Sequence, residues 1–335
     1  NINIIEKATG EIFAGVGTGT DGSSFSFGVK ENNYLGRGVK VDSNLNVTDE
    51  RIKGKILVSN PNYKNSDKRI DFSLDATSID RLASSGYKSN VTGFTIGTQF
   101  EYLDDFRLGI STKNNMESID VDSSASAKQK KQDGNYFDSF IGLDFIYDKR
   151  NQRYQTTSGF LSDYNLNLPI LSDTNTLTNV YNYKVFKELY ENNVSSLSFL
   201  FMAASSISGD DIKLSERMYI PGRKLRGFET GKIGPKDGSD FIGGNYVSTI
   251  NATTSLPKIL ENVQNVDIVM FADAANIWGV DYDSSLDKSG IRSSVGLGLD
   301  WLTPVGPLTF SFAKPITKES TDIEETFRFN IGTSF

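Results

Sequence analysis

ETFRFNIGTSF, residues 325–335, closes the chain and alternates strictly between two kinds of residue. From Phe327 onward, every second position is apolar or Thr, and the positions between them hold Arg328, Asn330, Gly332 and Ser334. In a β-strand, successive side chains point to opposite faces, so one face here is largely apolar and the other polar. A strand that ends on an aromatic residue suits a lipid boundary better than water. The pattern therefore predicts a strand of an outer-membrane β-barrel.

The composition fits a barrel and excludes several other classes of protein. The chain of 335 residues has no cysteine and no histidine, which removes disulfide frameworks, Cys-based metal sites and His-dependent catalysis. Its net charge of −7 disfavours a nucleic-acid partner, because phosphate binding needs a basic surface. The mean hydropathy is −0.34, and the longest partly apolar uncharged run, Val194–Gly209, contains six serines, so no transmembrane helix is expected. A barrel remains compatible, because its lumen-facing side chains are polar.

Alternation of this kind recurs along the chain, for example over 94–102, 137–147 and 294–301. Read between turn signals, the sequence predicts sixteen strands. They are expected near residues 11–19, 23–30, 36–48, 51–60, 68–79, 91–103, 105–113, 135–148, 156–169, 178–190, 194–208, 241–256, 266–278, 290–303, 307–317 and 324–335. The predicted fold class is all-β, a transmembrane antiparallel up-and-down β-barrel.

The connections alternate in length, as expected for a bacterial barrel with short periplasmic turns and longer outer loops. Long connections are expected at 114–134, 209–240, 279–289 and 318–323; the inner ones include 104–105, 191–193 and 304–306, with 257–265 of moderate length. The polar segment Asn115–Gly134 contains Lys128, Lys130 and Lys131 and is interpreted as a solvated, mobile outer loop.

Two motifs resemble binding sites, but the sequence around them does not support that reading. The glycines between residues 15 and 22 resemble a phosphate-binding loop, yet no helical pattern follows, so a glycine-thinned first strand is favoured. The acidic stretch Asp281–Asp287 opens like a calcium loop, but Leu286 and Arg292 occupy the places of the required glycine and glutamate. We therefore expect no metal and no cofactor. No acid pair stands out as catalytic, so the chain is not expected to be an enzyme.

The segment Arg217–Asp240 is a long connection opened by Pro221-Gly222 and dense in Lys and Gly. Spacing alone leaves an ordinary flexible loop and a functional element equally compatible with it. Within this segment, Leu225-Arg226-Gly227-Phe228 resembles the (V/L)RG(F/Y) motif of the sixth outer loop in the BamA family of outer-membrane assembly factors.

The resemblance covers the whole chain in four further matches. These are Ala8-Thr9-Gly10-Glu11, similar to the junction after the last periplasmic POTRA domain; the early turn at Glu31–Gly38; Phe271-Ala272-Asp273 with Trp278-Gly279 in strand thirteen; and the closing hairpin Ser294–Pro315. The resemblance implies that residues 1–10 end the last POTRA domain and that 11–335 form the barrel, with POTRA domains before residue 1. No signal peptide is recognisable, so we expect a mature or trimmed form.

For the long loop, the resemblance implies a fold into the barrel lumen. There Arg226, with Gly227 and Phe228, would meet an acid of the barrel wall, and Asp273 lies at the matching position of strand thirteen. The family's second acid would fall at Thr253, so only one carboxylate is expected. Alternation places Asp273 on the same face as the apolar Val269 and Phe271. That the Asp273 side chain points into the lumen is therefore expected from the resemblance and not from alternation. An Arg–carboxylate pair is directional and bidentate, which suits fixing a register.

The function expected from the resemblance is assembly and insertion of β-barrel proteins into the bacterial outer membrane. An opened barrel exposes backbone groups that are costly in lipid unless another strand pairs with them, so an opened seam is a template for β-augmentation. The expected seam joins the first and last strands, at Gly15, Val16, Gly17 and Gly19 and at Phe329, Asn330, Ile331 and Phe335. Expected partners are nascent outer-membrane β-barrel proteins, accessory assembly lipoproteins and the lipid bilayer, with no nucleic acid.

Three alternatives remain at this stage. A related superfamily member, such as a translocation-assembly or two-partner-secretion transporter, would share the barrel and the Arg226-Gly227-Phe228 loop. A porin-type channel would conduct ions but does not predict that loop. An outer-membrane lipase or protease generally needs His or a paired-acid site, and the His-based version is excluded.

Overall fold

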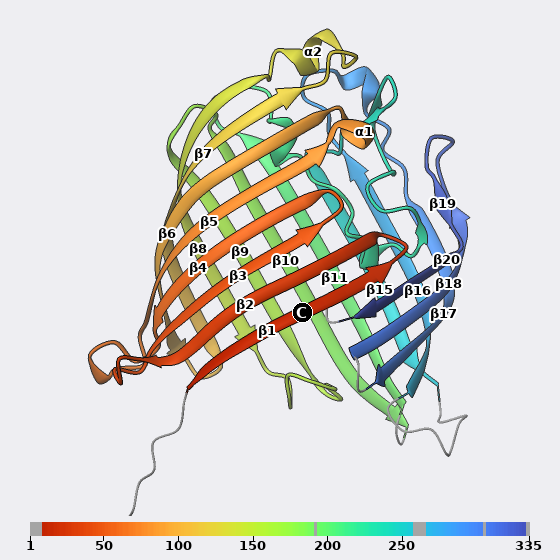
Figure 1. Cartoon of the computed structure of the whole chain (residues 1–335). Helices are drawn as coiled ribbons and strands as arrows, with labels where there is room; N and C mark the ends of the chain where they lie inside the picture. Colours follow the sequence, from red (N-terminus) through yellow and green to blue (C-terminus); the bar gives the residue numbers. More distant parts are fainter. Residues whose placement is uncertain (1–8, 191–192, 257–265, 304–305, 333–335) are drawn as a thin grey trace, which may run out of the picture.

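The computed structural model describes residues 9–190, 193–256, 266–303 and 306–332 and shows a closed barrel of sixteen antiparallel strands (Figure 1). Each strand pairs with its neighbour along the chain, and β1 closes the barrel against β20. The barrel strands are β1 Gly10–Gly19, β2 Gly22–Tyr34, β3 Val39–Thr48, β4 Arg51–Asn60, β5 Arg69–Arg81, β6 Tyr87–Leu103, β7 Phe106–Val121, β8 Gly134–Asp148, β9 Gly159–Ser172, β10 Thr176–Tyr190, β11 Asn193–Ser206, β15 Tyr246–Ser255, β16 Val266–Trp278, β17 Arg292–Thr303, β18 Gly306–Thr317 and β20 Phe327–Gly332. The predicted fold class and strand number are confirmed.

The other elements are short and lie in the connections. They are α1 Leu82–Ser85, α2 Ala127–Lys130, η1 Tyr63–Asn65, η2 Leu214–Glu216, η3 Gly222–Lys224, η4 Ser284–Leu286, the pair β12 Gly227–Phe228 with β19 Glu324–Glu325, and the pair β13 Lys236–Asp237 with β14 Asp240–Phe241. Within the described ranges, no helix has the length and apolar character needed to cross a membrane.

Alternation sorts the strand side chains onto two different faces. On β16, Met270 is 47% exposed, whereas Phe271 and Asp273 are 4% and 2% exposed. On β5 and β6, the register partners Leu74 and Phe94 are both exposed apolar residues. Exposed apolar side chains over a closed wall are the signature of a lipid-facing surface. We call this the outer face of the wall and the opposite one the covered face.

Aromatic side chains form a row on the wall where β8, β9 and β10 pair. Phe145 stacks on Tyr164 with ring centroids 6.1 Å apart, and Tyr164 contacts Tyr181 edge-on at 6.4 Å. The three residues are consecutive register partners. Rows of aromatic rings are typical of the girdles of membrane barrels, where an apolar body and a polar tip meet the lipid boundary.

The third strand begins later than predicted for a local reason. The expected strand at 36–48 starts at Val39, because Leu35, Gly36 and Gly38 adopt positive φ values of 53°, 69° and 67° and form the turn from β2. Two of these three positions are glycines, which adopt such backbone angles without steric cost. The turn is further held by the Asn33 side chain, which accepts a hydrogen bond from the Gly38 amide at 2.6 Å.

The expectation of a mobile loop over Asn115–Gly134 is wrong. Strand β7 runs to Val121 and pairs with β8 as far as Ile119 opposite Gly134. In the remaining connection, the Ser126 and Gln129 side chains cap α2 reciprocally, and Gln129 is fully buried. The strand extension was missed because its few apolar residues fall on both faces, with Met116 on one and Ile119 and Val121 on the other, which obscures the alternation used for prediction.

The last predicted strand, 324–335, divides into two elements. Glu324 and Glu325 form β19 and leave the barrel wall to pair with β12, and β20 begins at Phe327. The connection 207–245 between β11 and β15 is longer than the predicted 209–240, and it packs against the covered face. Of the predicted inner connections, 104–105 is confirmed between β6 and β7, whereas 257–265 and parts of 191–193 and 304–306 lie outside the described residues.

Candidate functional site

The Arg226-Gly227-Phe228 motif is seated in an apolar cluster between the long connection and the barrel wall. Phe228 is fully buried, and the cluster joins it with Leu225 of the same connection and with Val247 of β15 and Ile277 of β16. Gly227 has a φ of +94°, and a Cβ there would lie 3.2–3.3 Å from the side chains of Ala313 and Ser294. Only glycine fits this backbone conformation and this close approach without strain.

The structure brings Arg226 and Asp273 together as a bidentate pair. Arg226 donates from Nε to Asp273 Oδ2 at 2.7 Å and from Nη2 to Oδ1 at 2.8 Å. The Arg226 backbone amide donates to Oδ2 as well, at 3.1 Å. The Asp273 side chain is fully buried and that of Arg226 is 18% exposed. Two parallel charge-assisted bonds in a shielded place fix the orientation of the loop as well as its position.

Two wall residues complete the seat of Arg226. Its guanidinium lies over the Phe271 ring, 3.4 Å from the centroid, so the aromatic residue that shares the face of Asp273 serves as a platform for the cation. Asn251 of β15 donates from Nδ2 to Asp273 Oδ1 at 3.0 Å and to the Lys224 carbonyl at 2.7 Å. The contact from β15 therefore comes from an amide at 251, whereas Thr253, the expected place of a second acid, pairs in register with Phe271.

The long connection is also tied to the last strand. Gly227 and Phe228 pair with Glu325 and Glu324 through β12 and β19. Arg328 of β20 then donates to the Gly222 carbonyl at 2.7 Å and to the Phe228 carbonyl at 2.8 Å. This role of Arg328 was not predicted from the sequence, although Arg328 is the basic residue on the polar face of the last strand, and that position was the available signal.

A second ionic contact holds the connection to the opposite wall. Lys213 contacts Glu117 Oε2 of β7 at 3.0 Å, Asp138 of β8, and Glu216 at 3.6 Å, and its side chain is 2% exposed. Burial alone would lower the pKa of Lys213, but the three surrounding carboxylates raise it above its usual range. Burial raises the pKa of Glu216 to about 7, against the opposing effect of Lys213. One ammonium among three carboxylates leaves the cluster short of positive charge.

The acidic stretch Asp281–Asp287 serves the same connection. Asp281 forms an ion pair with Arg217 and accepts a hydrogen bond from the Ile212 amide at 2.6 Å. Asp283 pairs with Lys128 of α2 at 2.7 Å. Hydrogen bonds from Lys128 and Ser285 lower the pKa of Asp283 to about 2. These carboxylates therefore act as ion-pair partners that join three outer connections.

The seam between β1 and β20 is the shortest ladder of the barrel among the described residues. Its register pairs are Gly17 with Gly332, Thr18 with Ile331 and Gly19 with Asn330, compared with ten pairs between β1 and β2. The Thr20 amide adds a bond to the Phe329 carbonyl at 3.1 Å. Among the described residues, this ladder therefore has the fewest register pairs of any two neighbouring strands in the barrel.

The seam glycines allow close backbone approach. A Cβ at Gly19 would lie 2.5 Å from the Phe329 carbonyl oxygen, and one at Gly332, where φ is +126°, would lie 2.5 Å from the Val16 carbonyl oxygen. Gly15 and Val16 pair with β2, and within the described part of β20 they have no register partner. Phe335 lies outside the described residues.

A cavity of about 620 Å³ lies between the seam and the long connection. Thr18, Gly19 and Asn330 line it from the seam, and Lys224 and Arg226 line it from the connection. The motif and the seam therefore face one shared space, although Arg226 lies 208 residues after Thr18 and 104 residues before Asn330 in the sequence.

Residues 33–335 match the Omp85 superfamily domain. The outer membrane protein assembly factor BamA of Nitratidesulfovibrio vulgaris is 25% identical over 351 residues, which cover the whole of this chain and 43% of that protein. BamA of Neisseria meningitidis serogroup B is 24% identical over 392 residues, again with the whole of this chain and 48% of that protein. The chain spans less than half of the length of these relatives.

Solved structures agree on the fold. The crystal structure of BamA from Haemophilus ducreyi lacking POTRA domains 1-3 matches with a TM-score of 0.90 at 23% identity, covering 98% of this chain and 70% of that chain. CdiB from Acinetobacter baumannii matches with a TM-score of 0.61 at 12% identity, covering 97% of this chain and 60% of that chain.

Proposed function

This chain belongs to the Omp85 superfamily and has a BamA-type barrel of the bacterial outer membrane, and we propose that it assembles and inserts other β-barrel proteins there. The single observation that carries the proposal is the β1–β20 seam, whose ladder has three register pairs among the described residues. The BamA relatives, each matching the whole chain and named as assembly factors, support assembly over the transporter and porin alternatives.

The proposed mechanism is templating without bond chemistry. When β1 and β20 separate, the freed N–H and C=O groups of β1 pair with an incoming strand, because unpaired backbone groups are costly in lipid. The long connection lies in the lumen in this proposal, where the Arg226–Asp273 pair fixes it to the wall beside the seam. Nascent outer-membrane β-barrel proteins are the proposed clients. POTRA domains before residue 1 and accessory lipoproteins are part of the same proposal.

A reversible crosslink across the seam tests this function. Thr18 and Ile331 are register partners, and directly opposed residues in antiparallel strands lie within the Cα range of a disulfide. The chain has no cysteine, so Thr18→Cys with Ile331→Cys creates a single pair. The control is Ile56→Cys with Leu74→Cys, an exposed register pair between β4 and β5.

The variants are reconstituted in vesicles and mixed with an eight-stranded outer-membrane barrel protein unfolded in urea. The folded fraction of that client is followed by its heat-modifiable mobility on a gel. We expect the oxidised seam pair to lose the acceleration of client folding and to regain it on reduction, while the oxidised control keeps it. Full acceleration by a verified seam crosslink would rule out strand separation as the mechanism.

A further inference from the structure

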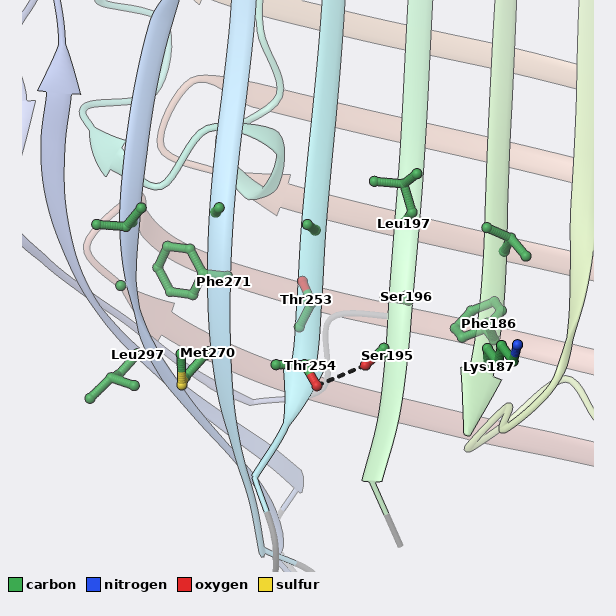
Figure 2. Close-up of a pocket in the computed structure, with 15 residues that line it drawn as sticks. Phe186, Lys187, Ser195, Ser196, Leu197, Thr253, Thr254, Met270, Phe271 and Leu297 are labelled. Carbon is green, nitrogen blue, oxygen red and sulfur yellow. Dashed lines mark hydrogen bonds between the residues drawn. The ribbon is translucent and has the colours of Figure 1, made fainter. Parts of the chain in front are cut away.

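A hollow of about 690 Å³ opens on the outer face of the wall, across β10, β11, β15, β16 and β17 (Figure 2). The floor of the hollow forms where two alanines lie between larger apolar side chains on the outer face. One lateral row of register partners runs Val185, Leu197, Ala252, Ala272 and Val295. Leu197 and Val295 are 49% and 45% exposed, so this row faces outward, and the two alanines between them leave the surface recessed.

The next row toward the short-turn end of the barrel is partly polar. Its register partners are Lys187, Ser195, Thr254, Met270 and Leu297. Ser195 Oγ and Thr254 Oγ1 lie 2.8 Å apart (Figure 2). A hydroxyl pair uses one hydrogen internally, so its second hydrogen remains able to donate to an external acceptor.

Lys187 supplies the positive charge of the hollow. It is exposed, it neighbours Ser195 in the register, and among the described lining residues it is the only charged one. Strand β10 ends three residues later at Tyr190, which places Lys187 within about 10 Å of the strand end. The same end of the barrel carries the short 104–105 turn between β6 and β7, and short turns of bacterial barrels are periplasmic.

We propose that this hollow binds one phospholipid of the periplasmic leaflet. An acyl chain lies over Ala252 and Ala272, and the phosphate accepts hydrogen bonds from Lys187 and from the Ser195–Thr254 hydroxyl pair. Charge complementarity selects this occupant, because a single ammonium at the headgroup level attracts a phosphate while the rest of the lining is largely apolar. The volume falls within the range of about 300–1,000 Å³ typical of ligand pockets. The inference depends on the membrane location of the barrel and not on the proposed assembly function.

A second outer-face hollow provides an internal control. It measures about 480 Å³ and includes Ala76 of β5 and Gly54 of β4, with Leu45 and Leu74 at its sides. Its charged lining residues are one cation, Lys55, and one anion, Asp75, which form an ion pair at 3.8 Å, so the cation there already has a partner. Both hollows offer apolar space and a lysine, but the β10–β17 hollow has a hydroxyl pair beside a lysine that forms no ion pair with the described residues.

Native mass spectrometry of the chain released from nanodiscs of phosphatidylglycerol tests the proposal. The variants are Ala252→Leu with Ala272→Leu, which fills the hollow; Lys187→Gln, which removes the charge; and Ala76→Leu, which fills the second hollow. Heat-modifiable gel mobility confirms that each variant is folded. A parallel set of nanodiscs doped with diacylglycerol supplies the same acyl chains without a phosphate.

We expect the unsubstituted chain and Ala76→Leu to retain one phosphatidylglycerol at collision energies that strip bulk lipid. The doubly filled variant should lose it, and Lys187→Gln should reduce its retention by about fivefold, the effect of one lysine at a membrane surface. Equal retention by the filled variant would overturn the site. Equal retention of diacylglycerol and phosphatidylglycerol, or an unchanged Lys187→Gln, would overturn the phosphate contact.

Discussion

Replacing Arg226 by alanine should release the long connection and leave the barrel closed. The substitution removes two bonds to Asp273, at 2.7 and 2.8 Å, and the contact with the Phe271 ring. Asp273 would keep the Asn251 amide and the backbone amide of residue 226 as donors, but it would lose its only ion-pair partner among the described residues.

The size of the effect follows from burial. The Asp273 side chain is fully buried, so the change leaves a carboxylate without a counter-charge in a shielded place. Removing one partner of a buried pair costs about 3–5 kcal/mol. This corresponds to a rise of roughly 10²- to 4 × 10³-fold in the opening equilibrium of the connection. The strand ladders of the wall do not depend on Arg226, so their stability should change little.

Hydrogen exchange read separately for residues 207–245 and for the barrel strands measures this division. Lys232→Ala is the matched control, because the Lys232–Glu229 pair lies in the same connection but is more than one-third exposed on both sides. Exposed pairs contribute about 0–1 kcal/mol, so that variant should exchange nearly as the unsubstituted chain does. Unchanged protection of the connection in Arg226→Ala, or parallel loss in the strands, would refute the reasoning.

Three further predictions concern the other contacts. Burial raises the pKa of Glu216 from about 4.5 to about 7 when residues 207–245 are docked against the wall. As pH rises from about 4.5 to about 7, Glu216 loses its proton in the undocked connection but keeps it in the docked one. Docking of residues 207–245 therefore weakens across that pH window. Hydrogen exchange should show this weakening, and Glu216→Gln should abolish it; a flat profile in the unsubstituted chain would contradict it. Gly19→Ala should loosen the seam, because the added Cβ would clash with the Phe329 carbonyl oxygen. Gly54→Ala is the control, because nothing lies within 4 Å of the Cβ it would add. The rate of disulfide formation in the Thr18→Cys/Ile331→Cys pair should fall in the Gly19→Ala variant only. Arg328→Gln should lower protection both at 222–228 and at the seam, since Arg328 bonds the Gly222 and Phe228 carbonyls, and loss at one place alone would argue against coupling.

The barrel was predictable because a membrane wall imposes a period of two on every strand. That signal failed where apolar residues are few and fall on both faces, as in Asn115–Val121, which belongs to strand β7 and is not loop. It also failed at Glu324–Glu325, which extend the last strand in sequence but pair with β12. In both places the pairing partner, and not the local alternation, determines the structure.

The contacts of the long connection were predictable only in part. The Arg226–Asp273 pair followed from the family resemblance, since alternation puts Asp273 beside the apolar Phe271. Phe271 turned out to face the covered side as the platform for Arg226. Lys213 meets Glu117 across 96 residues of sequence, and no local pattern marks such a pair. Polar contacts at that separation depend on the closed shape of the barrel.

The contacts of the connection suggest which edge of the seam moves. Strand β20 has five register pairs with β18, and it is additionally held by Arg328 and, through β19, by the motif at Gly227 and Phe228. The same motif is fixed to β16 by the Arg226–Asp273 pair, so the connection braces the wall from β16 to β20. On the other side of the seam, β1 is held by its ladder to β2. Because directional hydrogen bonds and a buried ion pair resist displacement of β20, we infer that β1 and the strands after it swing away and present the free edge to a client strand.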